Sequence, residues 1–106
     1  MLKINASEIY QLSELVDYQA GSVVSREIIQ KPTGTITVFA FDEGQGLSEH
    51  KAPFDALVHI IAGKAQVMIN DQQFELVAGE MIILPVNEIH ALKAIERFKM
   101  SLIMIR

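Results

Sequence analysis

The sequence of 106 residues predicts a single all-β domain, an antiparallel sandwich or barrel, preceded by one short helix. After Gly21 the chain consists of short runs rich in Val, Ile, Thr and Phe, and Gly, Pro, Asn or Asp turns separate these runs. Half of the residues are apolar and 21% are charged, a composition typical of globular chains. A chain of this length can bury one hydrophobic core but not the cores of two domains.

The helix is predicted over residues 7–16, because Ser7 can cap it and Ile9, Leu12 and Val16 recur at helical spacing. We therefore divide the chain into an N-terminal helical segment, residues 1–21, and a barrel domain, residues 22–106. The strands of the barrel are predicted near 22–30, 34–42, 45–51, 56–62, 64–70, 72–78, 81–85, 88–94 and 97–105.

Two of the predicted strands are apolar on both faces. In the strand 34–42, Ile36 and Val38 alternate with Phe39 and Phe41, and the strand 97–105 has the same character. The outward face of such a strand needs a second cover, which the N-terminal helix or a partner subunit can supply. We therefore expect a homodimer.

The net charge and the cysteine content restrict the classes of partner and of chemical site that the chain can have. Nine basic residues against thirteen acidic ones give a net charge of −4, and the basic residues are scattered, so nucleic acid is not expected as a partner. The absence of cysteine excludes disulfides, thiolate nucleophiles and cysteine-type metal sites. Acidic residues interrupt the N-terminal region and no apolar run approaches 18 residues, so we expect a soluble cytoplasmic protein that does not bind membranes.

Two stretches of the sequence resemble the motifs of the cupin superfamily. Six residues fall at the glycine, proline and histidine positions of these motifs with the required spacing: Gly44, His50 and Gly63 in the first motif, and Gly79, Pro85 and His90 in the second. The fifteen residues between the motifs, 64–78, match the short spacing of small bacterial cupins. The resemblance covers residues 22–105 and implies a small single-domain jelly-roll barrel, also called a double-stranded β-helix, of six to eight strands.

The resemblance also implies a depleted metal site. In metal-dependent cupins the first motif supplies two histidines and a glutamate, and the second supplies one histidine. Here His50 and His90 remain, whereas Ala52 stands in the place of the other histidine and Ala56 in the place of the glutamate. His50 and His90 are thus the candidate ligands for a divalent metal such as Zn, Ni, Mn or Fe.

The neighbouring residues offer poor substitutes for the missing ligands. Glu49 and Asp55 each lie one residue from a position that faces the cavity, and a shift of one residue reverses the face of a strand unless a bulge intervenes. The cupin frame places His59 outside the cavity. Asn87 replaces the glycine of the second motif and Ala94 its asparagine, so we expect the turn before His90 to be built differently.

The resulting hypothesis is a cupin that binds a small molecule inside its barrel. His50 and His90 would orient the ligand, Ala52 and Ala56 would leave an apolar pocket, and Phe54 would lie at the mouth as a lid. In a second interpretation the pocket left by the two alanines is filled by a neighbouring methionine: Met68, Met81 or Met100.

Two other functions stay open at this point. One is a metal-dependent oxygenase or isomerase in which Glu49 or Asp55 completes the ligand set. The other is a non-catalytic structural or regulatory module that dimerises or binds another protein through its sheet. The residues do not decide whether the chain is an enzyme, and they do not name its ligand.

Overall fold

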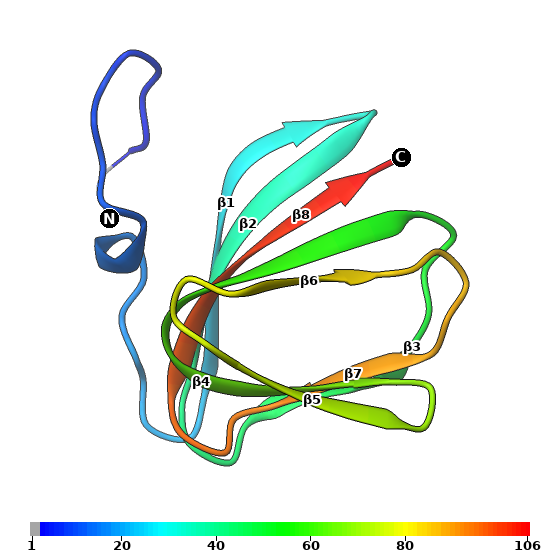
Figure 1. The fold of residues 1–106 in the computed structure, drawn as a ribbon. Coiled ribbons are helices and arrows are strands. Elements are labelled where there is room, and N and C mark those ends of the chain that lie inside the picture. The colour runs from blue at the N-terminus through cyan, green and yellow to red at the C-terminus, as the bar shows by residue number, and fades with distance from the viewer. Residues whose placement is uncertain (1–2) are drawn as a thin grey trace.

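Two antiparallel sheets face each other and share one long strand, β4, in the computed structural model, which describes residues 3–106 (Figure 1). Sheet A consists of five strands in the order β1 (Val23–Lys31), β2 (Gly34–Phe41), β8 (Phe98–Ile105), the first half of β4 (Asp55–Ile69) and β6 (Met81–Leu84). Sheet B has the order β5 (Gln72–Val77), the second half of β4, β7 (His90–Lys93) and β3 (Gly46–His50). The predicted all-β barrel is confirmed.

The prediction of two strands at 56–62 and 64–70 is wrong, because both belong to β4. Gly63 lies inside this strand with φ +78°, and the pairing with β8 shifts its register between Ile60 and Ala62. A side chain at position 63 would collide with the carbonyl oxygen of Arg97. The glycine therefore bends the strand from one sheet into the other instead of ending it.

The predicted helix over residues 7–16 is also wrong. A single 3-10 turn, η1 (Leu12–Glu14), is the only helical element within residues 3–106, and no helix there is long and apolar enough to cross a membrane. Ser7 has φ +65°, which differs from the extended conformation of a capping residue, and Ile9 is fully exposed. A ten-residue helix that buries no apolar face is marginal in water, so the helical spacing of its apolar residues has no effect here.

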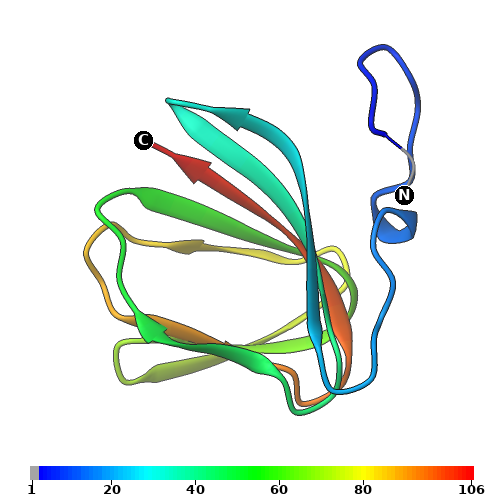
Figure 2. The ribbon, with the colours of Figure 1, turned by 180° about the vertical axis from the view of Figure 1, so that it is seen from behind.

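The N-terminal segment nevertheless covers part of the outer face of sheet A (Figure 2). Val16 is 4% exposed and packs against Val38 and Ala40, which are fully buried. The ammonium group of Lys99 donates a hydrogen bond to the carbonyl oxygen of Ser13 and so ties the segment to β8. Part of the second cover expected for β2 therefore comes from the chain itself, while the division at residues 21 and 22 stays a prediction.

The hydrophobic core fills the space between the two sheets. The rings of Phe41 and Phe98 stack at its centre with centroids 4.5 Å apart. Along β4, Ala56, Val58 and Ile60 point inward, so the residues between them face outward. The buried core also includes Ala65, Val67, Leu76, Leu84, Leu92, Ala94 and Met100.

Candidate functional site

A cavity of about 170 Å³ lies inside the barrel between the two sheets. All five residues predicted as ligand-binding line it: His50, Ala52, Phe54, Ala56 and His90. Six apolar side chains complete the wall: Leu47, Leu84, Leu92, Met100, Leu102 and Met104. Among the described residues that line this cavity, the two imidazoles are the only polar side chains.

Most of these six apolar residues did not figure in the sequence-based site. Their position follows from strand alternation, because residues two apart on a strand share a face. Leu92 lies two residues after His90 on β7, and Met100, Leu102 and Met104 alternate along β8. The period-two pattern, counted from His90, could therefore have identified Leu92, and the alternation along β8 could have grouped its three residues, whereas Leu47 is separated from His50 by a bulge.

A bulge in β3 turns His50 into the cavity. Leu47 pairs with Leu92 and faces inward, so regular alternation would place Glu49 inward and His50 outward. The register instead shifts between Leu47 and His50, and His50 becomes the partner of His90 across the two strands. The extra residue thus selects the imidazole over the carboxylate for the cavity.

The two imidazoles contact each other edge to face, with ring centroids 4.3 Å apart and an angle of 74° between the planes. The Nε2 atoms lie 3.0 Å apart. Each Nδ1 atom faces a backbone carbonyl oxygen: that of Ser48 at 2.7 Å from His50, and that of Glu88 at 3.2 Å from His90. The flanking backbone therefore holds both rings in orientation.

These contacts require more protons than two neutral rings possess. A carbonyl oxygen only accepts hydrogen bonds, so each Nδ1 must carry a proton, and a hydrogen bond between the Nε2 atoms needs a third. Two neutral imidazoles carry two protons in total. The pair is therefore one proton short when both rings are neutral, and a proton donor or a positive charge beside the Nε2 atoms would complete it.

The surroundings of His90 favour its neutral form. Burial lowers its pKa below the ordinary value, and the charge of a protonated His50 lowers it further, against a smaller opposite effect of the Glu88 carbonyl. His90 is 5% exposed, whereas His50 is exposed to solvent on one side. Near neutral pH His90 thus offers the lone pair of its Nε2 atom to the cavity.

Two loops meet at the mouth of the cavity. Asn87, between β6 and β7, donates a backbone hydrogen bond of 2.8 Å to the carbonyl oxygen of Ala52, between β3 and β4. Asn87 has φ +62°, a left-handed conformation that asparagine tolerates, so the turn does not require the glycine of the cupin motif. Phe54 lines the cavity from the same loop as Ala52, and the guanidinium of Arg106 lies 5.2 Å from the centre of its ring.

Neither carboxylate considered as a third metal ligand lines the cavity. Glu49 lies against a hollow on the outer face of sheet B, and Asp55 accepts a hydrogen bond of 2.9 Å from the backbone amide of Val86. Within residues 3–106 no cluster of three or more His, Cys, Asp or Glu side chains could hold a metal ion. Catalytic metal sites typically have three protein ligands, so this pair of imidazoles does not fit a resident metal.

The methionines fill the cavity only in part. Met100 is fully buried and lines the cavity wall together with Met104. Met68 instead lies on the outer face of sheet B, and Met81 is 47% exposed. The interpretation that Met68 or Met81 occupies the room left by the alanines is therefore wrong.

His59 lies outside the cavity, as the cupin frame implies. It is half-buried on the outer face of sheet A, where it pairs with Ser101 of β8 and Met81 of β6. It does not line the cavity, so it provides a control for the two histidines that do.

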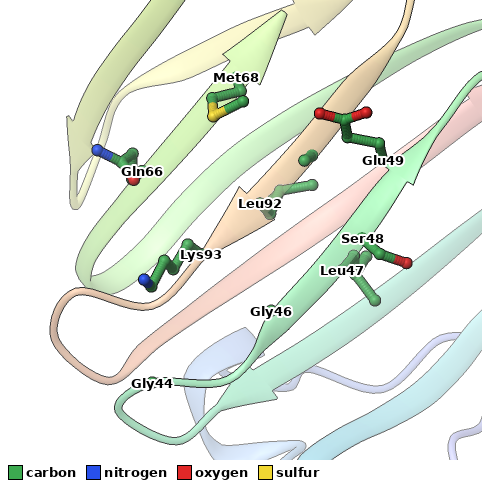
Figure 3. A pocket seen from close by; sticks show the side chains of 10 residues that line it. Gly44, Gly46, Leu47, Ser48, Glu49, Gln66, Met68, Leu92 and Lys93 are labelled. Atoms are coloured by element: carbon green, nitrogen blue, oxygen red, sulfur yellow. The ribbon is translucent and has the colours of Figure 1, made fainter.

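A second hollow, of about 350 Å³, lies on the outer face of sheet B (Figure 3). The small residues Gly46 and Ala91 line it together with Met68, and Lys93 and Glu49 stand well apart at its rim. It is open to solvent and contains no histidine. The interior cavity, with its paired imidazoles, is therefore the stronger candidate for specific chemistry.

Comparison with known proteins identifies the family. Residues 33–105 match the family model of the AraC-like ligand binding domain. The structure is similar to a conserved protein of unknown function from Streptococcus pyogenes, with 32% identity over 100% of this chain and 96% of that one and a TM-score of 0.92. It also resembles a cupin superfamily protein from Desulfitobacterium hafniense, with 28% identity over 96% and 94% of the two chains and a TM-score of 0.91.

A third similar structure is a cupin 2 conserved barrel domain protein from Leptotrichia buccalis, with 39% identity and a TM-score of 0.89. The match covers 92% of this chain and 47% of that one, so the chain spans about half the length of that protein. No match to a curated protein was found. The resemblance drawn from the two motifs is confirmed, and the chain belongs to the AraC-like ligand-binding family of small single-domain cupin barrels.

Proposed function

We propose that this protein binds a small molecule inside its barrel and that His50 and His90 hold the polar group of the ligand. The observation that supports this function is the lining of the cavity, in which two imidazoles meet an otherwise apolar wall. A pocket with few polar groups on an apolar surface is typical of sites for small organic ligands. The family match supports a ligand-binding role in general but does not name the ligand.

The cavity restricts the size of the ligand. A volume of about 170 Å³ is comparable to the engineered apolar cavities of roughly 150 Å³ that admit benzene. The body of the ligand is therefore expected to be one ring or a short branched chain. Larger molecules would have to extend out through the mouth beside Phe54.

The imidazole pair restricts the polar group. Because the contacts of the neutral pair are one proton short, a group that supplies a proton satisfies it: a hydroxyl, a phenol or a carboxylic acid. A ligand that only accepts hydrogen bonds would face the two lone pairs and gain nothing from them. The expected ligand is thus a compact apolar molecule with one proton-donating group.

A fragment screen tests this function. The full chain is exposed to small alcohols, phenols and carboxylic acids, matched with their methyl ethers and esters, and binding is followed by thermal shift and by NMR. We expect the donors to bind and the capped analogues to bind at least about tenfold more weakly, because one hydrogen bond to the pair is lost. Binding should also disappear in His50→Ala and His90→Ala.

The matched control is His59→Ala, which removes a histidine from the outside of the same strand that carries Ala56. It should bind the fragments like the unaltered protein. Fragment binding that survives both His50→Ala and His90→Ala would reject the imidazole pair as the polar anchor. The absence of any binding fragment below the size limit of the cavity would reject the barrel interior as the site.

The two imidazoles alone do not support a metal-dependent oxygenase or isomerase, so catalysis is not part of the proposal. The cytoplasmic location stays a prediction from the sequence. The homodimer expected from the strands that are apolar on both faces also stays a prediction from the sequence.

A further inference from the structure

The inward-facing row of β8 continues beyond the cavity to Arg106. Met100, Leu102 and Met104 line the cavity from this strand, and residues two apart on a strand share a face, so Arg106 is the next inward position. The backbone amide of Arg106 donates a hydrogen bond of 2.8 Å to the carbonyl oxygen of Thr33, which extends the pairing of β8 with β2 by one residue. Arg106 therefore keeps the strand geometry that directs its side chain toward the barrel.

Arg106 and the two imidazoles lie at the same end of the barrel. Ile105 pairs with Asp55, the first residue of β4, while His50 is the last residue of β3 and His90 the first of β7. In Figure 1 the C-terminus and the loops that follow β3 and β6 accordingly lie together on the right. Because β8 belongs to sheet A whereas β3 and β7 belong to sheet B, the guanidinium and the imidazoles approach the mouth from opposite walls.

Phe54 positions the guanidinium at the mouth. Its ring lines the cavity, and the central carbon of the Arg106 guanidinium lies 5.2 Å from the centre of that ring. This distance is within the range of a cation–π contact. The positive charge is thus held beside the opening through which a ligand longer than the cavity would extend.

The guanidinium of Arg106 keeps its hydrogen-bond donors available. Neither of the two ion pairs found within residues 3–106 includes Arg106. Two carboxylates lie at this end of the barrel, and each already accepts a hydrogen bond: Asp55 from the backbone amide of Val86 at 2.9 Å, and Glu88 from the side-chain amide of Asn70 at 2.8 Å. A guanidinium presents five N–H donors in a planar fork that matches the two oxygens of a carboxylate.

We propose that Arg106 binds an anionic group of the ligand, so that the ligand is a hydroxy acid. Its hydroxyl donates to the imidazole pair, its apolar body fills the cavity, and its carboxylate passes Phe54 and meets the guanidinium. Since the two polar sites lie on opposite sheets, the hydroxyl and the carboxylate stand at opposite ends of the body. This inference rests on the proposed function, which places the hydroxyl. The guanidinium is open to water, so its contribution to affinity is modest and decreases with salt.

Titration of the full chain with para-hydroxyphenylacetate and with para-hydroxyphenylacetamide, followed by NMR, tests the anion site. The two probes share the phenol and the ring and differ only in the charge at the other end. We expect the carboxylate to bind at least about threefold more tightly than the amide at low ionic strength. The difference should shrink at about 0.5 M salt, because salt screens exposed charges.

Arg106→Gln should abolish this preference and still bind the amide like the unaltered protein. Arg106→Lys keeps the charge but loses the planar fork, so part of the preference should remain. Arg97→Gln is the matched control, because it changes the net charge by the same amount at a guanidinium that already pairs with Asp42. It should prefer the carboxylate as the unaltered protein does.

The outcomes separate this inference from the function on which it rests. Equal binding of the two probes by the unaltered protein rejects Arg106 as an anion site and leaves the imidazole pair as the polar anchor. A preference that persists in Arg106→Gln assigns the anion to another cation, and an equal loss of both probes in that variant shows a structural role. If neither probe binds, or if His50→Ala binds both like the unaltered protein, the proposed function fails and the anion site fails with it.

Discussion

The Nε2 atom of His50 lies 3.0 Å from the Nε2 atom of His90, although 40 positions separate the two residues in the sequence. The pairing of β3 with β7 brings the strands together, and the bulge after Leu47 gives His50 the inward orientation. Carbonyl oxygens on the far side of each ring leave both Nε2 atoms directed at each other. The pair therefore acts as one group with a single shared need for a proton.

Acid should destabilise the protein through His90. Burial, and to a lesser extent the charge of His50, lowers the pKa of His90 in the folded chain. Above the ordinary histidine pKa of about 6.5, neither the folded nor the unfolded chain protonates this ring, so stability is complete. One proton between the Nε2 atoms satisfies the pair, whereas a further proton on His90 must be buried beside that charge. As the pH falls below about 6.5, His90 of the unfolded chain binds a proton that His90 of the folded chain resists, and stability is lost until the pH passes the lowered pKa.

Calorimetric melting between about pH 8 and about pH 5 at constant ionic strength measures this effect. His90→Gln removes the titrating ring from the cavity and should flatten the decline in melting temperature below about pH 6.5. Parallel declines in the variant and the unaltered protein would show that His90 does not cause the acid sensitivity.

Filling the cavity should abolish ligand binding without unfolding the barrel. Ala56→Val adds two methyl groups to an inward position beside about 170 Å³ of free space. We expect ligand affinity to fall at least about tenfold while the free energy of unfolding changes by less than about 1.5 kcal/mol. Ala91→Val, on the outer face of sheet B, is the control, and titration of both variants with the best fragment measures the difference.

Divalent metals should bind weakly. Two imidazole nitrogens without a carboxylate are expected to hold Zn²⁺ or Ni²⁺ with a dissociation constant above about 1 µM. Protein purified without a histidine tag should then carry less than about one metal ion per ten chains, and a chelator should not lower its melting temperature. Stoichiometric metal that remains after dialysis against the chelator would contradict this expectation and would indicate a third protein ligand.

Thr35 offers a route to a more stable barrel. Its side chain is 5% exposed, and its hydroxyl has no hydrogen-bond partner among the described residues. Thr35→Val keeps the shape and the preference for a strand but removes the unsatisfied hydroxyl, so stability should rise by about 1 kcal/mol. Denaturant unfolding measures this gain, and Thr37→Val, on the same strand, should give a smaller one. A loss of stability in Thr35→Val would mean that its hydroxyl is satisfied in solution.

The cavity residues were predictable because motif spacing and strand alternation together determine which side chains point inward. His50 and His90 fall at ligand positions of two motifs, and Ala52 and Ala56 follow from the same frame. The side on which Glu49 lies was also predicted, from its place next to His50, but the bulge that separates both residues from the inward Leu47 was not. A bulge depends on the pairing of two strands, which a single sequence does not specify.

Other features depend on long-range packing and were missed for that reason. Residues 7–16 have helical spacing, but no apolar surface lies against Ile9, and the spacing alone does not stabilise a helix. Gly63 was predicted to separate two strands, whereas the approach of Arg97 makes it a bend within one.

The long strand β4 connects the two sheets that form the walls of the cavity. One uninterrupted strand belongs to both sheets, so at the β4 edge the two walls of the cavity are joined covalently, and its ladders to β8, β6, β5 and β7 hold it in each sheet. Entry of the proposed ligand would then require movement of the two loops at the mouth, which the backbone hydrogen bond from Asn87 to Ala52 joins. A change in the size of the proposed ligand would then require new side chains on the cavity wall rather than a different arrangement of the two sheets.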